Sequence, residues 1–183
     1  MDYFIKVIKE SIIVVIISSL IGILSGTFLS TNENILSTIP FILLLLPAIN
    51  SLIGDISTIM ISRLTTHLLI GSIPPSIKKS KRLIEDFIGL LLTILLSLAV
   101  LLIVGHIITY STDISLVNPI EIEIIIILTI IIMFGLIFFM MFISSIFLFK
   151  RGKDPNNFLI PFITSLIDFL NPFLIIVFIT IFI

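Results

Sequence analysis

One short stretch near the C-terminal end carries residues whose types and spacing suit the binding of a cation. Thr164, Asp168 and Asn171 recur at positions i, i+4 and i+7, so a helix places them on one face. They offer a hydroxyl, a carboxylate and an amide oxygen, and Mg²⁺ and Ca²⁺ prefer oxygen ligands. No lysine or arginine lies near Asp168 in this stretch. The pattern therefore predicts a divalent-cation site.

A second polar group surrounds Asp55 inside another hydrophobic region. Gly54 precedes it, and polar side chains flank both residues at Asn50, Ser51, Ser57 and Thr58. Pro40 and Pro47 lie upstream, and a proline removes a backbone donor and kinks or breaks a helix. We therefore expect a broken helix whose freed carbonyls line a polar cavity beside Asp55. The alternative interpretation is a satisfied carboxylate in a helix kink.

The composition places these residues in a membrane protein. Of 183 residues, 58% are hydrophobic and only 11% are charged, whereas a soluble domain carries about 25% charged residues. The net charge of -1 does not suggest nucleic acid as a partner. The chain has no cysteine, and no arrangement of catalytic residues or phosphate-binding loop is present. We therefore expect a protein of the lipid bilayer that is not an enzyme and needs no resident cofactor.

Hydrophobic stretches separate into five spans, since a span needs about 20 apolar residues. We predict a single all-α membrane domain over residues 1–183, with a long and broken second helix. The predicted spans cover residues 10–29, 35–71, 83–108, 120–149 and 158–182.

Basic residues predict the orientation, because cytoplasmic loops are enriched in lysine and arginine. Five spans with a cytoplasmic N-terminus place three basic groups on the cytoplasmic side: Lys6 and Lys9; Lys78, Lys79, Lys81 and Arg82; and Lys150, Arg151 and Lys153. The opposite loops carry only acidic charges, at Glu33, Asp113 and Glu121. We expect a multi-pass protein of the cytoplasmic membrane.

Ionisable residues inside a span cost roughly 2.5–3.5 kcal/mol each on insertion scales, so each needs a reason. The candidates are Asp55, Arg63, His67, His106 and Asp168. One alternative to ion binding is a structural bridge between Asp168 and Arg63. Arg63 lies nearer the cytoplasmic end, however, where its side chain can reach water. His67 and His106 lie near the predicted membrane surfaces, which favours interfacial residues over metal ligands.

Two stretches resemble motifs of the MgtE family and its eukaryotic solute-carrier relatives. The segment from Pro47 to Thr66, which contains Gly54-Asp55 and Ser62-Arg63-Leu64, resembles the second-helix pattern P…GN…SRLST. A later segment resembles the family's DPDN…P…TS…D start of the fifth helix, through Asp154, Pro155, Asn157, Pro161, Thr164, Ser165 and Asp168. The chain looks like a half-size prokaryotic member of the solute-carrier-like branch.

The resemblance implies a divalent-cation transporter, with Mg²⁺ as the first candidate for the transported ion. In the family two such domains meet about a two-fold axis with the pore between them, and the Asp168 position binds the ion from both sides. Asp55 stands where the family usually has asparagine, which adds a negative charge near the pathway and puts ion selectivity in doubt. Because the chain begins almost directly with its first span, we expect no cytoplasmic sensing domain.

Three functions stay open at this point. The first is a homodimeric divalent-cation channel or carrier with Asp168 at its centre, where two carboxylates neutralise one divalent ion. The second is a Na⁺- or H⁺-coupled transporter of another solute, with Asp55 and Asp168 as coupling carboxylates. The third is a non-transporting membrane subunit.

Overall fold

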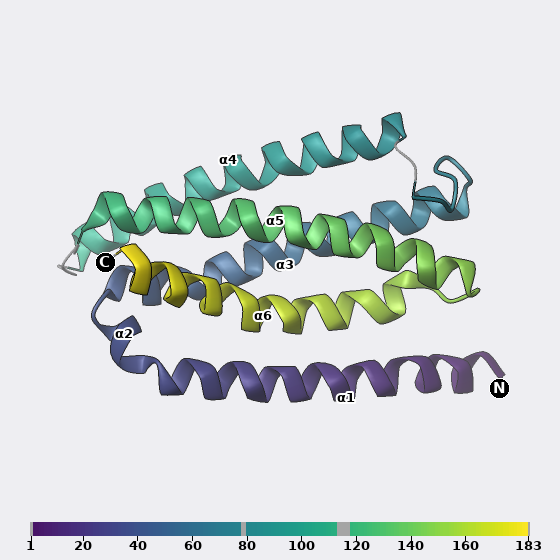
Figure 1. Ribbon diagram of the computed structural model, residues 1–183, viewed down its shortest axis with the longest axis horizontal. Coiled ribbons are helices and arrows are strands. Elements are labelled where there is room, and N and C mark those ends of the chain that lie inside the picture. Colours follow the sequence, from purple (N-terminus) through teal and green to yellow (C-terminus); the bar gives the residue numbers. More distant parts are fainter. Residues whose placement is uncertain (1, 78–79, 113–117, 183) are drawn as a thin grey trace.

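The computed structural model describes residues 2–77, 80–112 and 118–182, and before Ser11 it describes side chains only at Ile5 and Ile8. The predicted loop residues Lys78, Lys79 and Asp113, and the side chains of Lys6 and Lys9, lie outside the described residues. Six helices follow along the described chain (Figure 1): α1 (Asp2–Thr31), α2 (Glu33–Ser37), α3 (Pro40–Leu69), α4 (Lys81–Ser111), α5 (Pro119–Lys150) and α6 (Pro155–Phe182).

Five of these helices are long and apolar enough to cross a membrane, within the part of the chain that the structure describes. They are α1 from Ser11 onward, α3, α4, α5 and α6. The chain is therefore an all-α, multi-pass membrane protein with five spans, which confirms the predicted fold class.

Prolines and glycines define the helix ends. Pro40, Pro119 and Pro155 are the first residues of α3, α5 and α6, a position where the missing N–H has no intrahelical partner to lose. Gly71 and Gly152 follow the ends of α3 and α5 with φ of 71° and 67°. Glycine adopts this left-handed conformation without the steric cost that a Cβ imposes.

The second hydrophobic region is broken, as predicted, at the first of its two prolines and not at the second or near Asp55. The break lies at Thr38 and Ile39, between α2 and α3, just before Pro40. Pro47 and Asp55 lie inside the continuous helix α3. The expected cavity lined by freed carbonyls beside Asp55 was therefore wrong, because neighbouring helices pack along α3 and support it past its single internal proline.

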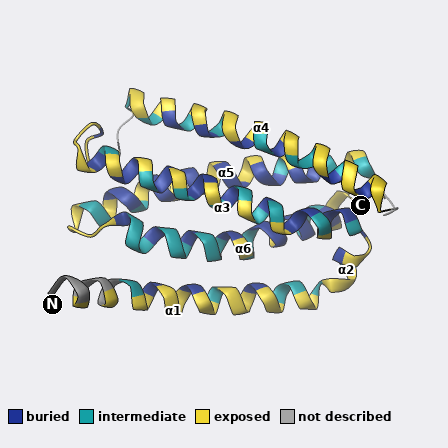
Figure 2. Cartoon of the chain, turned by 180° about the vertical axis from the view of Figure 1, so that it is seen from behind, coloured by how far each residue is buried: buried dark blue, intermediate teal, exposed yellow. Residues whose placement is uncertain are grey.

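Helix α6 is the centre of the arrangement. It packs against α1, α3 and α5, whereas α4 packs mainly against α3. Figure 1 shows α1 and α4 on opposite outer sides of the bundle, and Figure 2 shows that α1 is largely exposed from Ser11 onward. The core forms where α3, α5 and α6 meet, around residues such as Ile53, Ile130 and Ile163.

The connections α3–α4 and α5–α6 lie at the same end of the bundle as the N-terminus (Figure 1). We call this the basic end, because its described residues include Lys81, Arg82, Lys150, Arg151 and Lys153. Polar residues near the middle of the spans therefore lie well away from these charges.

Candidate ion site

Asp168 lies at the middle of the 28-residue helix α6, with an exposed side chain. Its Oδ1 accepts a hydrogen bond from Nδ2 of Asn50 on α3, at 3.1 Å. The Oδ1 of Asn50 in turn accepts a hydrogen bond from Nδ2 of Asn171. Two amides thus connect α3 to α6 and hold the carboxylate at the surface between these helices.

The predicted face of α6 divides into two parts. Asn171 is fully buried and reaches Asp168 only through Asn50. The hydroxyl of Thr164 donates to the backbone oxygens of Ile160 and Pro161, at 3.2 and 3.0 Å. Thr164 is half-buried, and its oxygen still has lone pairs that can accept from water. Asp168 and Thr164 therefore present oxygens outward, whereas Asn171 positions Asn50.

Helix α1 supports the backbone of α6 at the same place. Pro172 has no N–H, so the carbonyl of Asp168, four residues earlier, lacks its helical partner. The hydroxyl of Ser25 on α1 donates to this carbonyl. One heptad earlier, Ser18 donates to the carbonyl of Pro161 at 2.8 Å. These serines were not among the predicted site residues, although their spacing of seven is a signal for one helix face.

Asp55 is exposed on α3 and does not contact Asp168. Within the described chain, its side chain forms no hydrogen bond or salt bridge. Gly54 has open space beside it, since an added Cβ would meet nothing within 4 Å. Ser57 is buried on a different side of α3, beside a small cavity lined also by α4 and α5, and its hydroxyl donates to Ile53. The structure therefore does not bring Ser57 to the Asp168 site.

A polar stripe runs along the exposed side of α3. Its members are exposed or half-exposed and recur at helical spacing: Ser51, Asp55, Thr58, Ser62 and Thr66. Elsewhere the exposed faces of the spans carry isoleucine, leucine and phenylalanine. Intramembrane polar and charged residues face a bundle interior or a water-filled cavity rather than lipid. The stripe is therefore a polar strip on a surface that is otherwise largely apolar.

Arg63 belongs to a separate cluster near the basic end. Its Nε donates to Oδ1 of Asp86 on α4 at 2.8 Å, and Nε2 of His67 lies 3.1 Å from Oδ2 of the same carboxylate. Asp86 is only 8% exposed. The alternative of a bridge between Arg63 and Asp168 was therefore wrong. Asp86 was not predicted, although it lies one turn into the span that follows a basic loop.

The two histidines each contact a carboxylate. His67 contacts Asp86, and Nε2 of His106 on α4 lies 3.0 Å from Oε1 of Glu123 on α5. His106 also places Nδ1 2.9 Å from the carbonyl of Leu102. Neither histidine lies in the hydrogen-bond network of Asp168, and their interfacial placement stays a prediction.

The motif around Asp154 forms the start of α6. Oδ1 of Asp154 accepts from the backbone N–H of Asn156 at 2.9 Å, as an N-cap does, and Pro155 follows at the first helical position. Asn157 and Pro161 lie in the first two turns, half-buried, and Ser165 is half-buried with its hydroxyl 3.3 Å from the Pro161 carbonyl. At about 1.5 Å per residue, Asp154 lies about 20 Å along the axis from Asp168.

The arrangement offers one carboxylate for a cation at its centre. Among the described residues, no group of three or more aspartate, glutamate or histidine side chains is placed to hold a metal ion. A carboxylate supplies one negative charge, and the nearby amide and hydroxyl are neutral. Such a set balances only one of the two charges of a divalent ion. The described chain therefore brings a single negative charge to this place.

Comparison with known proteins gives one match. The model of the family described as "MgtE: Divalent cation transporter" matches residues 46–178, which include the polar stripe of α3 and the Asp168 site. No curated protein and no solved structure shows a significant match to this chain.

Proposed function

The chain belongs to the MgtE family of divalent cation transporters, and from this premise we propose that it carries Mg²⁺ through a pore between two identical copies. The family is one of transporters, which confirms the expectation that the chain is not an enzyme. Its substrate class is a divalent cation, and the proposal adds the identity of the ion and the dimeric pore.

The observation that carries the proposal is the state of Asp168. Its carboxylate lies at the middle of a span, is exposed, and has an amide rather than a cation as its partner in the described chain. An intramembrane carboxylate without a neutralising partner is costly, and such residues mark ion pathways. A passing cation supplies the missing charge.

A second copy supplies the second carboxylate. Two Asp168 side chains facing each other across a two-fold axis neutralise one divalent ion, and closed two-fold symmetry is the commonest arrangement of identical subunits. The polar stripe of α3 and the open space beside Gly54 support this placement. Both lie on exposed parts of the helix that supplies Asn50, and both suit a watery passage better than lipid.

Mg²⁺ fits this chemistry because it sheds water reluctantly and is usually held by one or two carboxylates with several waters retained. Thr164 then contacts the water shell, and Asp55 adds negative charge along the approach. Asn171 orients Asn50 rather than the ion. Few direct ligands also keep binding weak enough for release, as conduction requires.

We place the basic end in the cytoplasm, following the positive-inside rule. The described cations at this end are Lys81, Arg82, Lys150, Arg151 and Lys153. The protein then spans the cytoplasmic membrane with Asp168 near its midplane.

The test is a flux assay on the purified protein in liposomes, with Mg²⁺, Mn²⁺, Co²⁺ and Ca²⁺ offered in turn. We expect Mg²⁺ uptake by the intact chain and a loss to background in Asp168→Asn, which keeps the size of the side chain and removes its charge. Glu121→Gln is the matched control, because it removes an exposed carboxylate at the opposite end from the basic residues. We expect its uptake to be unchanged.

The same assay separates the rival functions. Uptake that requires a Na⁺ or H⁺ gradient supports the coupled transporter, and no flux of any ion supports the non-transporting subunit. Normal Mg²⁺ uptake by Asp168→Asn contradicts the assignment of the central site.

A further inference from the structure

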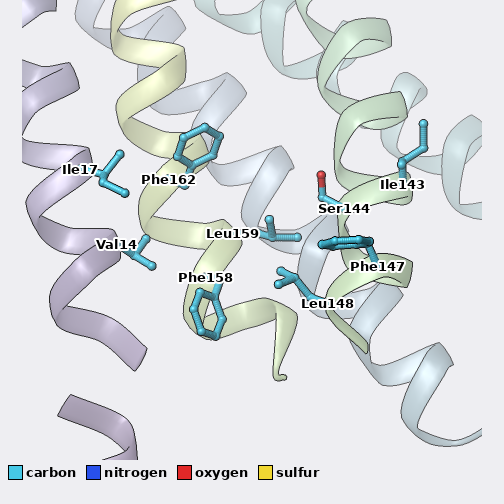
Figure 3. A pocket seen from close by; sticks show the side chains of 9 residues that line it. All are labelled: Val14, Ile17, Ile143, Ser144, Phe147, Leu148, Phe158, Leu159 and Phe162. Carbon is cyan, nitrogen blue, oxygen red and sulfur yellow. The ribbon is translucent and has the colours of Figure 1, made fainter. Parts of the chain in front are cut away.

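An apolar groove lies between α1 and α5 near the basic end, on the side of α6 shown in Figure 3. Both helices pack against α6, which forms the floor of the groove between them. The groove has a volume of about 390 Å³, within the range of roughly 300–1,000 Å³ of small-molecule sites. It is lined by Val14, Ile17, Ile143, Ser144, Phe147, Leu148, Phe158, Leu159 and Phe162.

Two cations lie over the aromatic rings at the mouth of this groove. Cζ of Arg151 is 4.0 Å from the ring centroid of Phe147, and Nζ of Lys153 is 4.7 Å from that of Phe158. Both distances are within the range of cation–π contacts. The side chains of Arg151 and Lys153 are thereby held at the end of the groove where α5 stops and α6 begins.

The charges of Arg151 and Lys153 are available to an outside anion. In the described part of the chain, neither takes part in a salt bridge, and the neighbouring Asp154 uses its carboxylate to cap α6. An aromatic face attracts a cation but does not neutralise it. The groove therefore combines an apolar trough with positive charge at one end.

A second apolar groove at the same end lacks this combination. It lies between α4 and α5, has a volume of about 600 Å³, and is lined by residues such as Phe87 and Phe139. The nearest described cations on α4, Lys81 and Arg82, lie 3.9 and 3.6 Å from the carboxylate of Glu85. Their charge is partly compensated within the chain, so this groove fits any lipid tail without preference for the headgroup.

We propose that the groove between α1 and α5 binds an anionic phospholipid, with one acyl chain in the trough and the phosphate at Arg151 and Lys153. An amphiphile with a negative head is the ligand that matches both parts, since a free anion makes no use of the apolar lining. Basic pockets between membrane helices on the cytoplasmic side are known to take anionic headgroups. The inference rests on this groove alone and is independent of the transported ion.

The test is native mass spectrometry of the protein released from bilayers that contain equal amounts of phosphatidylglycerol and phosphatidylcholine. We expect retained phosphatidylglycerol to exceed phosphatidylcholine by about thirtyfold, because each of the two surface cations contributes about 1 kcal/mol toward an anionic lipid. Arg151→Gln with Lys153→Gln should abolish the preference. Lys81→Gln with Arg82→Gln is the matched control, since it removes the same charge at the same end and should preserve it.

Two variants at Ser144, whose side chain lies in the groove (Figure 3), test the apolar part. Ser144→Phe fills the groove and should release the bound lipid with both cations intact, while an unchanged melting temperature shows that the bundle is intact. Because the chain has no cysteine, Ser144→Cys reports contact with a second copy by forming a disulfide dimer.

Four results overturn the proposal. The first three are equal retention of the two lipids, an equal loss of preference in the control pair, and efficient disulfide formation through Ser144→Cys, which identifies the occupant as another protein chain. Displacement by millimolar inorganic phosphate, without effect from Ser144→Phe, is a fourth, because it identifies a free-anion site.

Discussion

Asp86 and Asp168 are two carboxylates inside predicted spans, with opposite surroundings. Asp86 is 8% exposed and contacts both Arg63 and His67, so its charge is compensated within the chain. Asp168 is exposed, and its described partner is the neutral amide of Asn50. The difference separates a carboxylate that joins α3 to α4 from one that has no cationic partner within the described chain.

The comparison predicts that charge removal has opposite consequences at the two positions. Asp86→Asn leaves Arg63 without its countercharge and His67 without its carboxylate partner, and we expect it to lower the free energy of unfolding. The loss is about 1–3 kcal/mol, the range for a hydrogen bond to a charged group, with Arg63 partly exposed to solvent. The melting temperature in detergent measures this change, and Asp168→Asn should leave it unaltered. Equal melting temperatures for Asp86→Asn and the intact chain would contradict a stabilising role for Asp86.

Asn50→Ala sharpens the description of the Asp168 site. The variant removes the donor to Asp168 and leaves the buried amide of Asn171 without its acceptor. A lost hydrogen bond of about 1.4 kcal/mol corresponds to a roughly tenfold fall in apparent affinity for the ion. The concentration dependence of Mg²⁺ uptake measures it. Asn34→Ala, at an exposed asparagine of α2, serves as the control, and an equal effect of both variants contradicts the role of Asn50.

Ser25→Ala tests the support that α1 gives to the same site. The carbonyl of Asp168 loses its hydroxyl donor in a place where Pro172 already removed the backbone donor. We expect a loss of about 0.5–1.5 kcal/mol in unfolding free energy. Ser19→Ala is matched, since Ser19 is exposed and donates only to Val15 of its own helix. If Ser25→Ala lowers the unfolding free energy by less than Ser19→Ala does, the hydrogen bond from Ser25 does not stabilise α6.

Gly54→Ala should have the smallest effect on the single chain, with the opposite sign. Alanine favours a helix over glycine by about 1 kcal/mol, and the added Cβ meets no atom of the chain within 4 Å. The melting temperature of the monomer should therefore rise slightly. A simultaneous fall in dimer content or uptake locates the partner copy beside Gly54, and unchanged dimer content excludes close packing there.

The spans and the central carboxylate could be predicted because each leaves a local signal. Hydropathy alone identifies five long apolar stretches, and Asp168 stands out as an acid with no basic residue near it in sequence. The start of α6 has a local signal too, because Pro155 is a proline and proline favours the first helical position. The two family motifs, one around Asp55 and one ending at Asp168, likewise identify the stretches of sequence that supply α3 and α6.

The partners of these residues could not be predicted, because they depend on how helices meet. Ser25 and Asp168 are separated by 143 positions in sequence, and Arg63 and Asp86 by 23 positions across a loop. The continuity of α3 past Pro47 and Asp55 could not be predicted for a related reason. An internal proline removes one hydrogen bond, and packing of α3 against three other helices compensates for it.

In the described chain, helix α1 packs mainly against α6, with a smaller contact to the short α2. During synthesis α1 therefore emerges before its main neighbour, α6, exists. Until α6 is made, the hydroxyls of Ser18 and Ser25 lack the α6 carbonyls to which they donate in the folded chain. Docking of α1 thus depends on α6, and truncation after α5 removes the helix against which α1 packs.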